Sequence, residues 1–312
     1  MTTRIRQRYA IIIGAALTLS VLIIGLSLYG AGQLNPAPAA SDKLAVAATI
    51  FPLADIARNI GGDYVNVTLI IPPGASEHAS DLSPRQLQSL AQAQAIFQIG
   101  HGLDTALTAR IAAATKTAEL VTVDRGISLG EFSLSGEDEH DHDSGIDPHY
   151  WLTVPNAKLI AQTISQTLQE LDPANATHYS LQTTNYLAEL DALEQELQTL
   201  ARAASTKEFI AMHNAWSYLA DHYGLQLVGT YEPTEGRQPS LQDIQVLQKL
   251  IAQHSIKTFY AEPQKQSAGA TRLLAQDLGL TIQVLDPVGG LPPYDSYITL
   301  MRENLRALAA AD

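Results

Sequence analysis

The chain has no cysteine among its 312 residues. Disulfide bonds and thiolate metal sites are therefore excluded. A lipid anchor on an N-terminal cysteine is excluded for the same reason. Any metal site in this protein must use histidine, aspartate, glutamate or backbone oxygen as its ligands.

Basic side chains are scarce, with 19 lysines and arginines against 32 acidic residues, which gives a formal net charge of −13. Nucleic-acid binding requires lysine and arginine to neutralise phosphates, so we expect no nucleic-acid partner. The acidic balance is compatible with cation binding but does not establish it, because acidic surfaces mostly keep proteins soluble.

The N-terminus carries the longest apolar run. Residues Ala10–Tyr29 contain no charge and are long enough to cross a bilayer. Three arginines precede the run and predict that this end stays in the cytoplasm. The spacer at 35–43 contains an A-x-A pattern, Ala37–Ala39, at which a signal peptidase would cut. We favour an uncleaved transmembrane anchor over a cleaved signal. Both place the remainder outside the cytoplasmic membrane, in the periplasm or at the cell surface.

Beyond the spacer, short apolar strands alternate with helices, which is typical of parallel sheets covered on both faces. Strands are expected at 43–50, 65–71, 95–99, 119–124, 207–213, 225–231, 256–262 and 281–286. Helices are expected at 52–60, 83–93, 104–115, 154–171, 215–223, 240–254, 266–278 and 294–310. The predicted fold class is α/β, with two doubly wound lobes.

A long helix is expected at 175–204, because this segment has neither proline nor glycine. It would span roughly 45 Å at the usual rise per residue. We favour a rigid strut between the lobes over a coiled-coil hairpin, because strand–helix units resume after it. The expected organisation is an N-terminal anchor or signal with linker, a first lobe, the connecting helix and a second lobe. Their respective ranges are 1–41, 42–174, 175–204 and 205–312.

Candidate metal ligands fall at the ends of the expected strands, where doubly wound sheets bind their ligands. His78 follows the second strand of the first lobe. His149 lies in a loop immediately before a helix. His213 and Asp286 end the first and last strands of the second lobe. These four residues predict a metal site that is divided between the lobes.

Several neighbouring residues have two interpretations. His101 also follows a strand, and a residue with no role at the site is favoured over a supporting contact to a ligand. Glu262 ends a strand and would either hydrogen-bond a ligating imidazole or contact a helix end. For Tyr150 and Trp151, which follow His149, core packing is favoured over an aromatic cage.

The segment 131–148 is polar and acidic, so we expect a loop there. Within it, "EDEHDHD" at 137–143 holds His140 and His142. Two functions remain open for this segment: weak collection of metal near the site, or none beyond that of a solvated acidic loop.

Five motifs together resemble a known family. The segments "PPGASEH", "DPHYWLTVPNA", "IAMHNAWSYLADHYGL", "FYAEPQ" and "LDPVGG" are similar to those of the zinc- and manganese-binding proteins that serve ABC transporters. The resemblance runs from about Leu44 to the C-terminus. It implies two α/β lobes joined by one rigid helix, with a metal ion between them.

The resemblance also implies the ligands, namely His78, His149, His213 and Asp286. In some zinc-binding members the acidic residue before the first histidine takes part instead, and here that residue is Glu77. Manganese-binding members commonly have glutamate at the position of His213. Three imidazoles with one carboxylate suit tetrahedral Zn²⁺, whereas Mn²⁺ prefers oxygen-rich sites, so we favour zinc.

We therefore expect a high-affinity Zn²⁺-binding protein that delivers the ion to an ABC importer. Its partners would be the permease and ATPase subunits, and the protein itself would be a monomer. An Mn²⁺-specific protein of the same family is the alternative. A zinc hydrolase is the rival from another class, and it would need an open coordination position and a general base, such as Glu77 or Glu262. Because the sequence has no H-E-x-x-H motif, we expect no enzyme.

Overall fold

The computed structural model describes residues 43–78, 82–115, 118–132, 145–232, 239–266 and 268–310. The apolar segment Ala10–Tyr29 lies outside this part of the chain, as do His140 and His142. Among the residues that are described, no helix is long and apolar enough to cross a membrane.

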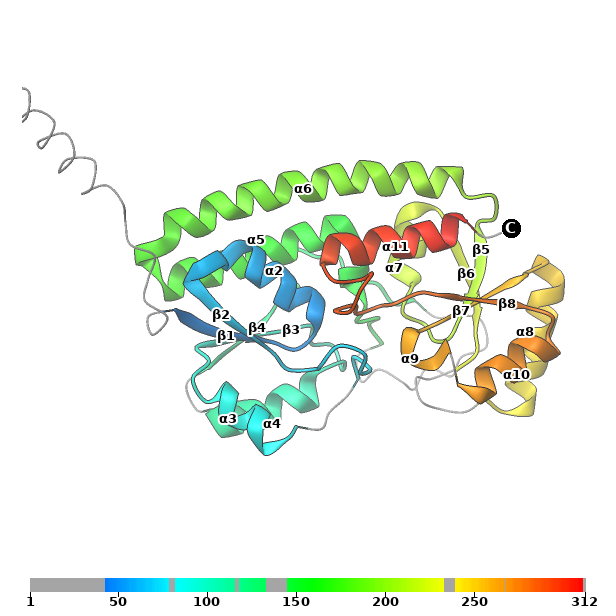
Figure 1. Ribbon diagram of the computed structural model, residues 1–312, viewed down its shortest axis with the longest axis horizontal. Helices are drawn as coiled ribbons and strands as arrows, with labels where there is room; N and C mark the ends of the chain where they lie inside the picture. The colour runs from blue at the N-terminus through cyan, green and yellow to red at the C-terminus, as the bar shows by residue number, and fades with distance from the viewer. Residues whose placement is uncertain are drawn as a thin grey trace, which may run out of the picture. The chain divides into compact units, whose positions relative to one another are not determined.

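The first lobe contains a four-stranded parallel sheet in the order β2-β1-β3-β4 (Figure 1). Its strands are β1 (Leu44–Ala48), β2 (Val65–Leu69), β3 (Ala95–Gln98) and β4 (Glu119–Thr122). Helices α2 (Phe51–Gly61) and α5 (Val154–Leu171) lie on one side of it. Helices α3 (Pro84–Leu90) and α4 (Thr105–Thr115) lie on the other side.

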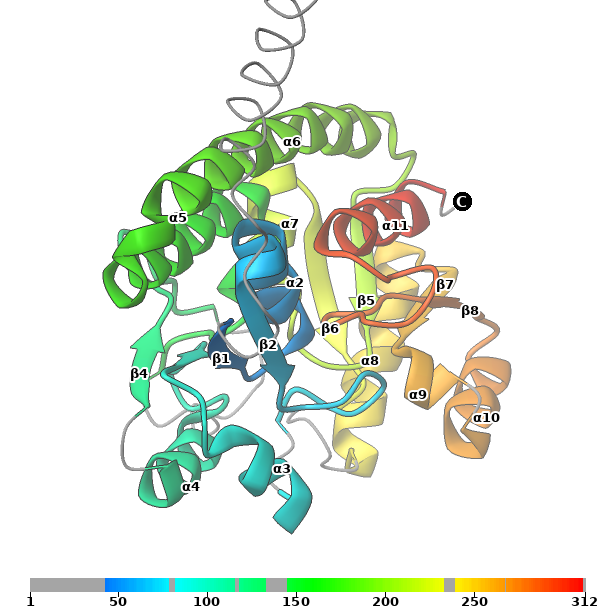
Figure 2. The same ribbon diagram turned by 60° about the vertical axis from the view of Figure 1, so that its left-hand side comes forward.

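The second lobe repeats this strand order, with a parallel sheet β6-β5-β7-β8. Its strands are β5 (Glu208–Ala211), β6 (Gln226–Thr230), β7 (Thr258–Ala261) and β8 (Thr281–Val284). Its helices are α7 (Ser217–Tyr223), α8 (Leu241–His254), α9 (Pro263–Gln266), α10 (Gly269–Asp277) and α11 (Tyr297–Ala309) (Figure 2).

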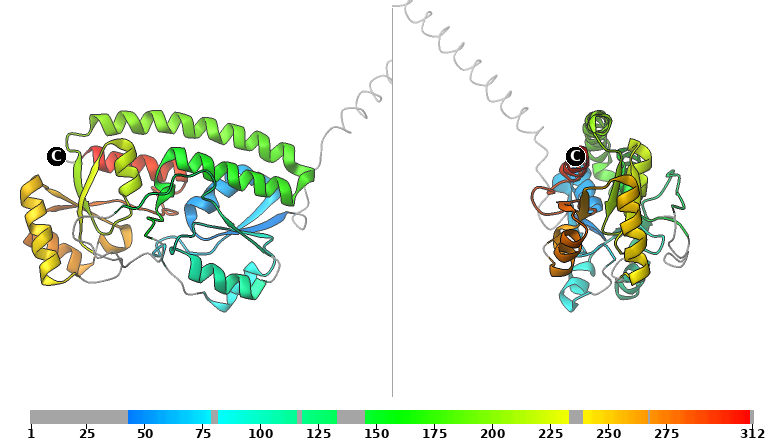
Figure 3. Two further views of the ribbon diagram at one scale, coloured as in Figure 1. Left: turned by 180° about the vertical axis from the view of Figure 1, so that it is seen from behind. Right: turned by 90° about the vertical axis from the view of Figure 1, so that its right-hand side faces the viewer.

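Helix α6 (Ala176–Ala203) links the two lobes and is about 42 Å long at the usual rise per residue. It contacts α2 and α5 of the first lobe and α7 and α11 of the second (Figure 3). Its buried residues recur at the helical spacing that faces these partners: Tyr179, Thr183, Tyr186, Leu190, Leu193, Leu197 and Ala201. The predicted strut is therefore confirmed.

All eight expected strands are present, but each is shorter than predicted. Apolar residues continue past the strand ends, as at Ile70 and Ile71, and these residues are buried without being part of the strand. The helix expected at 266–278 begins only at Gly269, because a separate turn, α9, precedes it. Helix α8 begins within one residue of its predicted start, because Ser240 and Asp243 form a capping box at its N-terminus.

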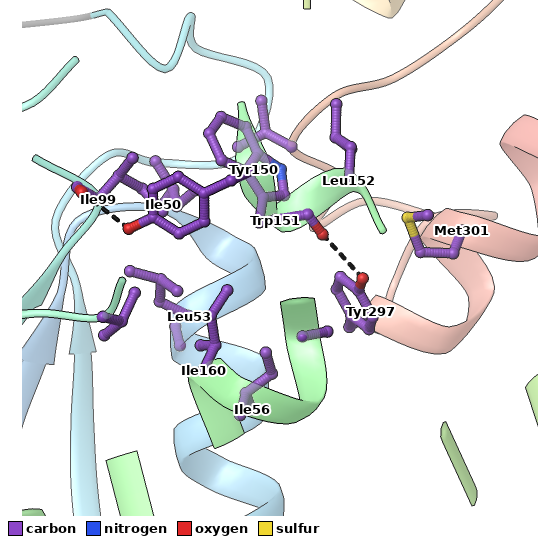
Figure 4. Close-up of a cluster of buried hydrophobic side chains, with 14 of the residues drawn as sticks. Ile50, Leu53, Ile56, Ile99, Tyr150, Trp151, Leu152, Ile160, Tyr297 and Met301 are labelled. Atoms are coloured by element: carbon purple, nitrogen blue, oxygen red, sulfur yellow. Dashed lines mark hydrogen bonds between the residues drawn. The ribbon is translucent and has the colours of Figure 1, made fainter. Parts of the chain in front are cut away.

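The lobes share one continuous apolar core on the side of α6. Trp151 is fully buried, and its indole N–H donates a hydrogen bond to the carbonyl of Pro287 in the second lobe, at 2.8 Å. The hydroxyl of Tyr297 on α11 donates to the carbonyl of Trp151, also at 2.8 Å (Figure 4). Tyr150 is buried in the same cluster. Core packing by Tyr150 and Trp151 is thus confirmed, and it ties the lobes together.

Candidate metal centre

Four side chains converge between the lobes. Glu77, His78, His149 and His213 each offer one ligand atom, and these atoms all lie within 4.8 Å of one another. The three imidazole rings have centroid separations of 5.5 to 6.2 Å. This arrangement agrees with the expectation from the sequence that the three histidines meet. The fourth side chain of the group is Glu77.

The chain topology explains this convergence. Glu77 and His78 lie in the loop that follows β2. His149 immediately precedes the short turn Tyr150–Leu152, and His213 follows β5. β2 and β5 belong to different sheets, and doubly wound sheets bind their ligands just beyond the carboxyl ends of the strands. The loops that follow these two strands meet at this group, so each lobe supplies part of it.

The donor atoms of this group are buried. Glu77 is 0 % exposed, His149 1 % and His213 3 %. The Nε2 atoms of His149 and His213 lie 3.8 Å and 3.4 Å from Oε1 of Glu77. Neither Nε2 atom makes a hydrogen bond with any described residue. Buried imidazole nitrogens without a hydrogen bond are costly unless a ligand occupies them, so this geometry indicates a cation site.

Asp147 sets the orientation of His149. Its Oδ1 accepts a hydrogen bond from Nδ1 of His149 at 2.8 Å and another from the backbone N–H of His149 at 2.9 Å. A carboxylate at Nδ1 keeps the proton on that nitrogen, which leaves the lone pair of Nε2 for a metal. Asp147 was not predicted from the sequence, although its position two residues before a candidate ligand was an available signal.

Glu262 orients His213 in the same way. Its Oε1 accepts from Nδ1 of His213 at 2.5 Å, and its Oε2 accepts from Gln264 at 2.7 Å. Of the two interpretations left open for Glu262, the hydrogen bond to a candidate ligand is the one that this contact supports. Burial alone would lower the pKa of His213, but the hydrogen bond to Glu262 and the negative charges of Glu262 and Glu77 raise that pKa well above 6.5. In the metal-free protein, protons therefore compete for this imidazole.

Asp286 lies beside the group but is not a member of it. Its Oδ1 accepts hydrogen bonds from the backbone N–H groups of Val288 and Gly289, at 3.0 and 2.8 Å. Burial raises the pKa of the Asp286 carboxyl, those two amides oppose the rise, and the charges of Glu77 and Glu262 add to it. One carboxylate oxygen of Asp286 is therefore already engaged by backbone amides.

His101 is not a member of the four-residue group. Its Nε2 lies 2.9 Å from Oδ2 of Asp124, and its ring packs edge-on against Tyr150 at 6.2 Å between centroids. His101 is thus a neighbour of the residue that follows His149.

Comparison with known proteins identifies the family. Residues 46–311 match the family described as "Zinc-uptake complex component A periplasmic", ZnuA. The chain belongs to the ZnuA family. The match begins within β1 and runs past the end of α11, so it includes both lobes and every residue of the candidate centre.

Individual members of the ZnuA family cover most of the chain. The high-affinity zinc uptake system protein ZnuA of Bacillus subtilis (strain 168) is 29 % identical over 281 residues, which are 86 % of this chain and 87 % of that protein. A crystal structure of ZnuA has 29 % identity and a TM-score of 0.76, and the match covers 86 % of this chain and 99 % of that one. A zinc-bound ZnuA deletion mutant has 27 % identity and a TM-score of 0.75, with 87 % and 100 % covered. These likenesses confirm the two-lobed α/β fold.

Proposed function

We propose that this protein binds Zn²⁺ with high affinity outside the cytoplasmic membrane and delivers it to an ABC importer. The observation that carries the proposal is the buried group of three imidazoles and one carboxylate. Zinc is commonly held by four such donors in tetrahedral geometry, whereas Mn²⁺ prefers more oxygen ligands. The zinc-uptake names of the related proteins give independent support.

The proposed ligands are His78, His149, His213 and Glu77. From the sequence, Asp286 was the expected fourth ligand, with Glu77 as an alternative or supporting ligand. The distances favour Glu77, because its carboxylate faces two imidazole nitrogens. Asp286 is then a second carboxylate beside the site, where it adds negative charge and remains able to bind the metal through its other oxygen.

A transport role is favoured over hydrolysis. Four protein donors fill the coordination sphere of zinc and leave no position for an activated water, which a zinc hydrolase requires. The segment "GISLG" at 126–130 has the letters of a nucleophile elbow, but that motif needs a strand–turn–helix context. Here β4 precedes it and no described helix follows directly.

The function is tested by offering Zn²⁺ and Mn²⁺ together, at equal concentration, to the metal-stripped full-length chain. We expect one zinc ion per chain by mass spectrometry, because the imidazoles favour zinc. Retention of manganese in preference would establish the Mn²⁺ alternative, and binding of neither metal would refute the proposal. Ester or peptide turnover by the zinc-loaded protein would instead support the hydrolase.

The choice of carboxylate ligand has its own test. Glu77→Gln should lower zinc affinity by about 100-fold or more, since loss of a direct ligand should exceed the 10- to 100-fold cost of losing an outer partner. The matched change Asp286→Asn should cost about tenfold or less. Dissociation constants from competition with a chelator show which variant loses more zinc affinity. A larger loss in Asp286→Asn than in Glu77→Gln would make Asp286 the ligand.

We propose that Ala10–Tyr29 anchors the chain in the membrane and that 42–174 and 205–312 form the two lobes, with 175–204 between them. The partners are the permease and ATPase subunits, and the protein acts as a monomer. The mass of the membrane-bound protein tests the anchor. Cleavage near Ala39 would remove the whole segment Ala10–Tyr29 and lower the mass accordingly, whereas an anchor keeps the full-length mass.

A further inference from the structure

Tyr218, the second residue of α7, connects the two lobes at a point beside the proposed metal site. Its hydroxyl accepts a hydrogen bond from the backbone N–H of Gly130 at 2.8 Å and donates one to the carbonyl of Asp147 at 3.1 Å. Its ring packs edge-on against Phe132, at 4.9 Å between centroids. Gly130 and Asp147 are also joined directly, N–H to carbonyl, at 3.0 Å. The hydroxyl therefore bridges two backbone segments that belong to the other lobe.

These contacts continue to a proposed ligand. The backbone of Asp147 is held by Tyr218, and its carboxylate holds both Nδ1 and the backbone N–H of His149. Tyr218 also follows His213 by only five residues, on the segment that leaves β5. One short segment of the second lobe thus supplies a ligand and also holds the residue that orients a ligand from the first lobe.

We propose that Tyr218 is a positioning residue for metal binding, which fixes His149 relative to His213 through Asp147. This inference rests on the proposed zinc site. Glu262, which orients His213, is held by Gln264 within its own lobe. Asp147 differs, because the residue that holds it, Tyr218, belongs to the other lobe. This contact therefore sets the distance between a ligand of the first lobe, His149, and a ligand of the second, His213.

The hydroxyl of Tyr218 is suited to this role. The residue is 7 % exposed, and both hydrogen-bonding directions of its hydroxyl are used. Burial raises the pKa of Tyr218, so the hydroxyl keeps its proton and remains a donor near neutral pH. Tyr218→Phe removes the hydroxyl but keeps the ring against Phe132, and the unfolding temperature of the metal-free variant verifies that the fold persists.

The test is a double-mutant cycle of zinc affinity in the full-length chain, with Tyr218→Phe, Asp147→Ala and the double variant. Asp147→Ala should weaken binding about 10- to 100-fold, as expected for a partner of a ligating histidine. Tyr218→Phe should weaken it about three- to tenfold, the range that corresponds to one net hydrogen bond. In the Asp147→Ala background, Tyr218→Phe should have no further effect, because its path to His149 is already broken.

Tyr260→Phe is the matched control, since its buried hydroxyl also donates to a backbone carbonyl, that of Ala307, at 3.1 Å. It should leave zinc affinity unchanged. Wild-type affinity in Tyr218→Phe would overturn the inference, and so would an equal effect of Tyr218→Phe with and without Asp147. Absence of zinc binding by the wild-type chain would instead refute the proposed function, so the two failures are distinguishable.

Discussion

Replacing His213 with alanine should abolish tight zinc binding, with an affinity loss of more than about 100-fold. The substitution removes one of the donors that converge between the lobes. It also deprives Glu262, which is 2 % exposed, of the imidazole that accompanies its charge. A buried carboxylate that loses its partner is costly, so both the metal-bound and the metal-free protein should be affected. Chelator competition and metal content by mass spectrometry measure the effect.

His222→Ala provides the control for this experiment. His222 is also in the second lobe and also contacts a carboxylate, Oε1 of Glu194, at 2.8 Å. It lies on α7 and does not belong to the group of four. Zinc affinity should therefore remain at the wild-type value. If His213→Ala also bound zinc as the wild type does, His213 would not be a ligand.

Trp151→Ala should produce the largest loss of stability, about 3–5 kcal/mol, as expected for truncation of a fully buried aromatic side chain. The change leaves a cavity in the core that the lobes share. It also removes the indole N–H that donates a hydrogen bond to the carbonyl of Pro287. Denaturant unfolding of the metal-free protein measures the loss. Tyr297→Phe, which removes only the hydroxyl that donates to Trp151, should cost about 1 kcal/mol. Equal losses in the two variants would show that cavity formation does not dominate.

The secondary-structure elements and three of the four proposed ligands could be predicted from the sequence. Alternation of apolar strands with amphipathic helices identified all eight strands. The rule that doubly wound sheets bind ligands beyond the carboxyl ends of their strands selected His78, His149 and His213, which do meet. The predicted strands extended too far, because an apolar residue such as Ile70 is buried whether or not it is part of the strand.

Other features depend on tertiary contacts that no local pattern marks. The hydroxyl of Tyr218 reaches Gly130 and Asp147 across sequence separations of 88 and 71 residues. Asp286 was expected to end its strand, but β8 ends at Val284, and the turn that follows aims two backbone amides at one of the carboxylate oxygens of Asp286. The path of such a turn is set by the packing of α11, whose Asn304 binds the backbone of Asp286 on both sides.

The concentration of carboxylates around the three imidazoles has a consequence for folding. Four acidic side chains in this region are 8 % exposed or less: Glu77, Asp147, Glu262 and Asp286. Burying several negative charges together opposes folding, so the metal-free cleft is a locally frustrated part of a structure that is otherwise well packed. A bound dication would relieve this repulsion, and a ligand that binds only the folded state stabilises it by mass action. The lifetime of the protein in the cell would then rise and fall with the supply of the ion it captures.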